Sequence, residues 1–186
     1  MGIKEIYDEA TRKMENAIKV FQNELNRLRT GRASLTLLEG VKVDYYGTPT
    51  PVNQVASLSV PEARLIVVQP WDVSQIAAIE KAILSSDLGL TPTNDGKVIR
   101  IQVPQLTEER RKELTKLARK YTEEGRVAVR NLRRDANEAL KKLEKDKTIS
   151  QDEHKKAQTH IQDITDKEIK RVDGILSMKE KEIMEV

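Results

Sequence analysis

The segment that decides the fold runs from Leu106 to Lys147 and reads LTEERRKELTKLARKYTEEGRVAVRNLRRDANEALKKLEKDK. It contains no proline and one glycine, Gly125, and Thr107 followed by two glutamates is a typical helix start. Its apolar residues recur at steps of three or four, which predicts one helix with a single buried stripe. The predicted stripe consists of Leu114, Ala118, Tyr121, Gly125, Ala128, Leu132, Ala136, Ala139 and Leu143. Such a helix is about 60 Å long, too long for the interior of a compact domain of this size.

A row of basic side chains lies beside this predicted stripe. The arginine row, as we call it, comprises Lys112, Arg119, Arg126, Arg130 and Arg133, which a helical wheel places within a sector of roughly 60°. Residues 107–147 carry 14 basic and 9 acidic side chains, a net charge of +5, whereas the whole chain has +3. A charged helix face is usually only solvated, but arginine forks match phosphates bidentately, and around residues 126–135 the only acid is Asp135. With little aromatic surface for base stacking, the row favours binding to the backbone of a structured RNA.

Two further helices are predicted on either side of this segment. Residues 3–29 repeat apolar side chains at helical spacing, and Gly31 is expected to end that helix in the left-handed conformation. Ser150 and Glu153 form a capping box that begins another helix, which extends to about Ile183. Because only a tight turn separates this helix from the long one, the two are expected to pack antiparallel. The three helices predict an elongated antiparallel three-helix bundle.

The residues between the first two helices have a different pattern. Residues 41–46, 54–60, 64–68 and 97–103 are expected to form strands and residues 75–84 a short helix, with turns at 47–51 and 92–96. The chain is therefore expected to be an α+β protein of two domains. A bundle of residues 1–30 and 106–186 carries an inserted small α/β domain of residues 31–105, and the molecule is expected to be bent, with two arms. Gly31 and Pro104 at the two crossings predict a defined hinge.

The sequence offers little support for catalysis. There is no cysteine, which excludes disulfides and cysteine-ligated zinc, and no phosphate-binding glycine loop is present. His154 and His160 are six residues apart and do not share a helix face in the way that metal ligands at i and i+4 would. We therefore expect no enzyme activity, no metal and no cofactor. No signal peptide or membrane-spanning run is recognised, so a cytoplasmic protein without a membrane partner is expected.

Several segments together resemble the bacterial ribosome recycling factors over essentially the whole chain. The segments are RTGRAS at 29–34, VDYYGTPTP at 43–51, SDLGL at 86–90, LTEERRK at 106–112 and EGRVAVRNLRRDA at 124–136. The resemblance implies an L-shaped, two-domain translation factor that binds the post-termination ribosome. With elongation factor G and GTP, such a factor splits the ribosome into subunits that can be reused.

The resemblance also implies roles for individual residues. Arg130 and Arg133 are the first candidates for contacts with the rRNA of the large ribosomal subunit, followed by Arg126 and Arg29. The arm formed by the α/β domain is expected to meet elongation factor G and to swing about Thr30, Gly31 and Arg32 on one crossing and Val103, Pro104 and Gln105 on the other. A monomer is expected.

The alternative from another class is a structural or chaperone-like coiled-coil module that binds proteins. It would account for the helices and their charges but not for the preference for arginine in the row. Salt dependence separates the two hypotheses, because binding to an RNA backbone weakens steeply with salt and contacts between apolar helix faces do not.

Overall fold

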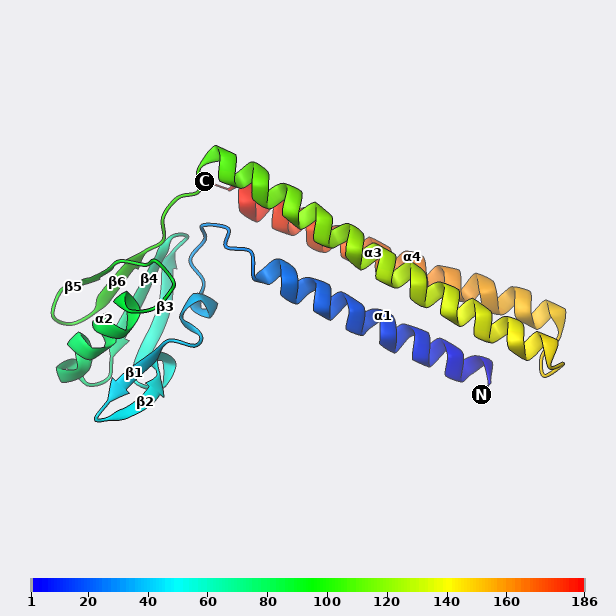
Figure 1. The fold of residues 1–186 in the computed structure, drawn as a ribbon, viewed down its shortest axis with the longest axis horizontal. Helices are drawn as coiled ribbons and strands as arrows, with labels where there is room; N and C mark the ends of the chain where they lie inside the picture. Colours follow the sequence, from blue (N-terminus) through cyan, green and yellow to red (C-terminus); the bar gives the residue numbers. More distant parts are fainter. Residues whose placement is uncertain (1, 186) are drawn as a thin grey trace. The chain divides into compact units, whose positions relative to one another are not determined.

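The computed structural model describes residues 2–185 and divides them into two compact units. One unit contains the helices α1 (Ile3–Asn26), α3 (Glu108–Lys145) and α4 (Gln151–Met184). The other contains residues Gly31–Thr107 with all the strands. The α+β class predicted from the sequence is confirmed, with long helices in one unit and small antiparallel sheets in the other (Figure 1).

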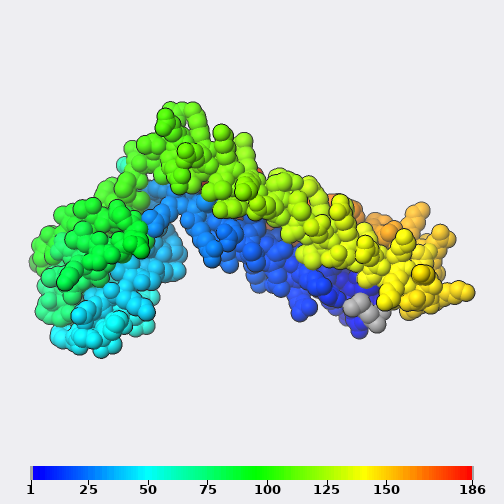
Figure 2. All heavy atoms as spheres, in the orientation of Figure 1, coloured from blue at the N-terminus to red at the C-terminus, as the bar shows by residue number. Residues whose placement is uncertain are grey.

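The three long helices lie side by side, and α3 packs along α4 and α1 (Figure 1). The turn between α3 and α4 ends in the predicted capping box, in which Ser150 Oγ accepts a hydrogen bond from the backbone of Glu153 at 3.2 Å. In return, a carboxylate oxygen of Glu153 accepts a hydrogen bond from the backbone N–H of Ser150 at 2.7 Å. Both backbone N–H groups, which have no partner inside the helix, are thus hydrogen-bonded. Helix α4 therefore begins sharply and returns antiparallel to α3. In Figure 2, α1 packs directly against the green and yellow surface of α3.

The stripe that α3 buries differs from the predicted one. Its buried residues are Leu114, Ala118, Thr122, Val129, Ala136 and Leu140. From Thr122 to Ala136 the spacing is seven residues, which places the seam one residue away from predicted members such as Tyr121 and Ala128. The hydroxyl of Thr122 can be buried because it donates to the carbonyl oxygen of Ala118 at 2.7 Å. A polar residue therefore occupies a core position that a purely apolar pattern assigns to its neighbours.

The first helix ends earlier than expected. Helix α1 stops at Asn26, and Arg27 closes its last turn in a right-handed conformation. Gly31 does adopt a positive φ of 74°, but it lies beyond the end of the helix, in the crossing to the second unit. Its conformation therefore serves the crossing and not a helix cap.

The second unit is built on a four-stranded antiparallel sheet of order β3-β4-β6-β5. The strands are β3 (Ala56–Glu62), β4 (Leu65–Pro70), β5 (Pro92–Asn94) and β6 (Ile99–Gln102), and a separate hairpin joins β1 (Lys42–Tyr45) to β2 (Thr48–Pro51). Helix α2 (Ile76–Leu84) contributes Ile79 and Ile83 to a core shared with the buried residues of β4 and β6. The short 3-10 turn η1 (Leu35–Leu38) precedes the hairpin. The sequence prediction assigns β2 and β5 to turns, because both segments are short and contain proline.

The loop of the hairpin contains a residue in an unusual conformation that contacts the rest of this unit. Tyr46 and Gly47 form the two-residue loop, and both have positive φ, 49° and 82°. The hydroxyl of Tyr46 donates to a carboxylate oxygen of Asp72 at 2.7 Å. Ser74 donates to the other oxygen of Asp72 from its backbone N–H and its hydroxyl, at 3.0 and 2.7 Å. These donors, Tyr46 first, lower the pKa of Asp72.

Replacing Tyr46 with Phe should raise the pKa of Asp72 towards its ordinary value of 3.8 without reaching it, because the Ser74 donors remain. Since the pKa is lowered in the folded state, the contact contributes stability above the ordinary pKa and loses it as the pH falls through the lowered value. Carboxyl-carbon NMR titration of both proteins measures this shift. An unchanged pKa in Tyr46→Phe would show that the hydroxyl does not hold Asp72.

The two glycines inside the long helices provide a matched pair. A Cβ at Gly174 would meet nothing within 4 Å, whereas a Cβ at Gly125 would meet the ring of Phe21 at 3.3 Å. We expect Gly174→Ala to raise the free energy of unfolding by about 0.5–1 kcal/mol, because alanine favours the helix. Gly125→Ala should gain less or lose stability, because Phe21 is buried and must move. Denaturant unfolding compares the two, and equal stabilisation would contradict this packing.

Candidate nucleic-acid interface

The structure places the arginine row along the side of α3 that meets α4. Arg119 donates through Nε to Glu180 of α4 at 2.7 Å, and Arg133 donates through Nη1 to the side-chain oxygen of Gln162 at 3.1 Å. Between them, Arg126 and Arg130 lie one helical turn apart. The four arginines of the row therefore form a line of guanidinium groups at the seam between two helices. Its lysine, Lys112, pairs instead with Glu108 of α3 itself at 3.2 Å.

Arg126 is the most firmly held member of the row. Its Nε and Nη2 donate to one carboxylate oxygen of Asp173 at 2.9 and 2.6 Å, and its Nη1 donates to Glu123 at 3.0 Å. These contacts, Asp173 first and then Glu123, raise the pKa of Arg126. Its side chain is 27% exposed, compared with 67% for Arg119. The guanidinium is thus fixed in orientation while one part of it still reaches solvent.

Glu123 joins two members of the row. One of its oxygens accepts from Arg126 and the other from Nη1 of Arg130, each at 3.0 Å. The two guanidinium groups, Arg126 first, lower the pKa of Glu123, so it remains a carboxylate at neutral pH. The expectation that Arg126 and Arg130 have no acid nearby except Asp135 is therefore wrong. Their counter-charges come from the preceding turn of α3 and from α4.

The arrangement suits reversible binding of an anion. Arg119, Arg126 and Arg130 pair with three carboxylates, Glu123, Asp173 and Glu180. Arg133 bonds the neutral Gln162, so the four arginines keep an excess positive charge. Ion pairs that are partly exposed contribute little to stability, typically below about 1 kcal/mol each. A phosphate can exchange with such a carboxylate at low cost, and the guanidinium forks are already oriented for bidentate contact.

Arg29, the remaining candidate for rRNA contact, lies after the end of α1 and is exposed. It directly precedes the first crossing between the units and is not part of α3. The other candidates occupy α3 itself, which is why the sequence, read as a helical wheel, could bring Arg126, Arg130 and Arg133 together. The partners of the row on α4 could not be found in that way, because the register of α4 on α3 is not visible in either sequence segment.

The first crossing is anchored at both ends, and the second is anchored on the sheet side. On the bundle side, the buried hydroxyl of Thr30 donates to Glu182 of α4, which also pairs with Lys179 at 3.3 Å. On the sheet side, the backbone N–H of Ala33 donates to Ala63 at 2.7 Å, and that of Val103 donates to Arg64 at 2.8 Å. Among the predicted hinge residues, Thr30 and Val103 are thus held by hydrogen bonds. Gly31 and Arg32 lie between the anchors at Thr30 and Ala33, and Pro104 and Gln105 follow the anchor at Val103.

The crossings also touch each other. A Cβ on Gly31 would lie 3.0 Å from Leu106 Cγ and 3.4 Å from the carbonyl oxygen of Pro104. With its positive φ, Gly31 is therefore required both for the backbone conformation and for the close approach of the second crossing. Leu106 is a contact residue that the sequence prediction missed, since its role depends on this approach. Within residues 2–185, no group of acidic, histidine or cysteine side chains could hold a metal, and no helix is long and apolar enough to cross a membrane.

Comparison with known proteins gives consistent matches over the whole chain. The family model for ribosome recycling factor matches residues 21–184. Ribosome-recycling factors of Nitratidesulfovibrio vulgaris and Geobacillus kaustophilus are 58% and 57% identical, over 100% and 98% of this chain and 100% and 99% of theirs.

Solved structures agree with these sequence matches. A solution structure of the ribosome recycling factor has a TM-score of 0.76 at 48% identity and covers 99% of this chain and 98% of its own. A second match, with a TM-score of 0.66, 49% identity and full coverage of both chains, is the Thermus thermophilus ribosome recycling factor. That relative is described together with Escherichia coli elongation factor G, bound to the E. coli post-termination complex. This chain belongs to the ribosome recycling factor family.

Proposed function

We propose that this chain binds the post-termination ribosome and, with elongation factor G and GTP, splits it into subunits that can be reused. Family membership supports this proposal, as does the likeness to a relative described with elongation factor G on that complex. In this proposal the chain is a cytoplasmic monomer with no catalytic group, metal or cofactor of its own. The chemical step, hydrolysis of GTP, belongs to elongation factor G.

The observation that carries the proposal is the arginine row on a helix of 38 residues. We infer that Arg130 and Arg133 contact phosphates of large-subunit rRNA first, and that Arg126 and Arg29 add to this contact. A long helix packed against two others deforms little, so charges spaced along it can meet phosphates spaced along an RNA backbone. Docking through backbone phosphates needs no base readout, which agrees with a row that lacks aromatic neighbours.

The crossings supply the second part of the mechanism. In this proposal, elongation factor G pushes on the unit of residues 31–105, and the chain bends at Gly31, Arg32, Pro104 and Gln105. The anchors at Thr30 and Ala33 limit the bending of the first crossing, and the anchor at Val103 and the start of α3 at Glu108 limit that of the second, as in a hinge. The helical unit then transmits the force to the contact between the ribosomal subunits.

Two substitutions in the row should change ribosome affinity in opposite directions. Arg130→Gln should weaken binding to the large subunit roughly three- to tenfold and reduce the salt slope by about one, because a phosphate contact is lost. Glu123→Gln should tighten binding, because it removes a carboxylate that competes with phosphate for Arg126 and Arg130. Filter binding across a salt series measures both effects.

Arg110→Gln is the matched control for this experiment. Arg110 lies on α3 about 160° from Arg126 around the helix and pairs with Glu113, so its loss should change the affinity little. Equal weakening by Arg110→Gln and Arg130→Gln would mean that net charge, and not the arginine row, governs binding. Salt-independent binding would instead favour a module that binds proteins through apolar helix faces.

The hinge has its own test in the splitting reaction. Light scattering of post-termination ribosomes should fall only when this chain, elongation factor G and GTP are all present. Gly31→Ala should leave binding to the large subunit intact but slow the fall, because alanine is strained at this φ and its Cβ crowds Leu106. Gly89→Ala, also at positive φ but with open space around it, is the control for backbone strain alone. Wild-type splitting by Gly31→Ala would contradict the hinge, and no fall with the wild-type chain would contradict the proposed function.

A further inference from the structure

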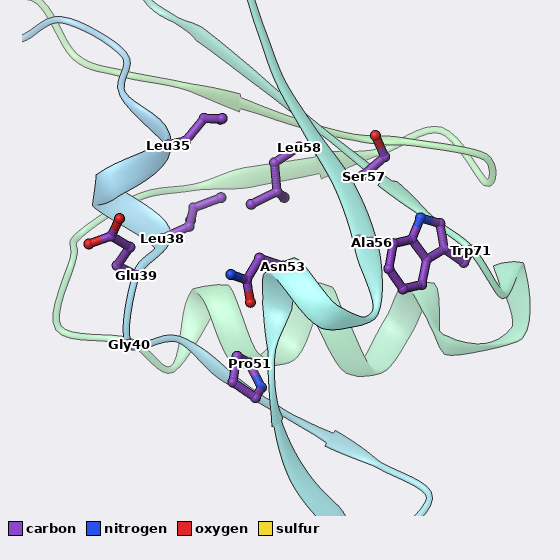
Figure 3. A pocket seen from close by; sticks show the side chains of 10 residues that line it. All are labelled: Leu35, Leu38, Glu39, Gly40, Pro51, Asn53, Ala56, Ser57, Leu58 and Trp71. Carbon is purple, nitrogen blue, oxygen red and sulfur yellow. The ribbon is translucent and has the colours of Figure 1, made fainter.

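A groove of about 460 Å³ opens in the second unit beside the sheet (Figure 3). The turn η1 forms one wall through Leu35 and Leu38, strand β3 forms the other through Leu58, and Trp71 lies at the far side of β3. Trp71 is 68% exposed and Leu35 is 41% exposed. Large apolar side chains gathered around a hollow, and left open to water, are typical of a surface that a partner covers.

The wall formed by β3 is an unpaired sheet edge. Strand β3 is the first strand in the sheet order and, within the described part of the chain, pairs with β4 alone. The backbone N–H of Trp71 donates to the carbonyl of Val55 across this pair, so the odd-numbered positions 57 and 59 also point towards β4. The N–H and C=O groups of Ala56 and Leu58 therefore point away from β4 towards the groove. Among residues 2–185, no backbone hydrogen bond joins these groups to another segment.

The chemistry of the lining selects the kind of partner. Glu39 is the one charged residue among those that line the groove, and no lysine or arginine accompanies it. Within the described chain, its carboxylate forms no ion pair. A nucleic acid is disfavoured here, because its phosphates would meet a carboxylate and no cation. A cationic group on the partner would instead complement Glu39.

The edge that β3 offers to a partner is short. Only Ala56 and Leu58 present outward groups before the register of β3 shifts between Ser59 and Glu62, where Pro61 offers no N–H. An added strand therefore takes backbone hydrogen bonds from only two residues of β3 and must gain the rest of its affinity from side-chain contacts in the groove. The η1 turn lies across the groove from β3 (Figure 3).

We propose that this groove binds an extended segment of a protein partner, which pairs with the backbone of Ala56 and Leu58 as an added strand. Alternate apolar side chains of that segment pack on Leu35, Leu58 and Trp71, and a lysine or arginine pairs with Glu39. This is recognition by strand addition, in which the main chain supplies affinity and the pockets supply specificity. The site uses no residue of the arginine row.

The test selects binding segments from random decapeptides displayed on phage, using the full chain as bait. Selected peptides are then made synthetically and titrated against the chain. Trp71 is the one tryptophan in the sequence, so its fluorescence reports occupancy of the groove directly. Amide NMR spectra of the same samples show whether the N–H groups of Ala56 and Leu58 become protected from exchange.

Two variants make the result specific. Leu58→Pro removes an N–H that points away from β4 and should weaken binding at least about tenfold while the β3–β4 pairing persists. Glu39→Lys changes an exposed side chain that does not support the fold, should weaken peptides with a matching lysine by about fivefold, and should favour peptides with glutamate in its place. Val73→Ser, which removes an exposed apolar side chain outside the groove, is the control and should bind as the wild type does.

The proposal is supported if the selected peptides alternate apolar residues, carry a lysine or arginine, protect both amides and reverse their charge preference with Glu39→Lys. It is overturned if selection yields no peptide above background, or if the peptides bind without changing Trp71 fluorescence. Dimerisation of the free chain through this edge, or binding of single-stranded RNA at Trp71, would also overturn it. The test contains no ribosome, so its failure leaves the proposed recycling function untouched.

Discussion

Arg126 and Asp173 join α3 to α4 near the middle of α3, and the orientation of the arginine row depends on this pair. Most of the stability of a helix in a protein comes from the packing of its apolar face, and α3 packs along α4 and α1. The buried seam sets which side of α3 faces its neighbours. The cross-helix pairs Arg126–Asp173 and Arg119–Glu180 then set where the guanidinium groups beside that seam point.

The carboxylates beside the arginine row have two opposing effects on the binding of a phosphate. The carboxylates of Glu123 and Asp173 orient the arginines, which lowers the entropy that an incoming phosphate must otherwise overcome. They also neutralise part of the positive charge that would attract that phosphate. A row with no counter-charges would attract RNA more strongly but would leave long side chains disordered along the helix. The observed balance of four arginines and three carboxylates favours a surface that binds a partner specifically and reversibly.

Helical periodicity carried most of the sequence prediction, and its errors have physical causes. The three helices, the capping box at Ser150 and the positions of the row on α3 follow from spacing alone. The exact seam did not, because Thr122 is buried through a hydrogen bond within its own helix. The counter-ions on α4 depend on the register between two helices, which no local pattern encodes.

In the small unit, β2 and β5 lie at sheet edges, where proline is tolerated, so prolines that indicated turns in fact occur in strands. Gly31 was recognised as a special position, but its close approach to Leu106 could be seen only in the folded backbone.

Docking of the arginine row on large-subunit rRNA, with the carboxylates of the seam holding the row in place, is tested most directly by electron cryo-microscopy. The sample is this chain bound to the large ribosomal subunit. We expect the guanidinium groups of Arg130 and Arg133 to lie within hydrogen-bond distance of rRNA phosphates. We also expect at least one of the ion pairs of Glu123, with Arg126 or Arg130, to be replaced by a contact between that arginine and the RNA. An rRNA contact through the outer face of α1, with the Arg126–Asp173 and Arg130–Glu123 pairs intact and facing solvent, would contradict this assignment.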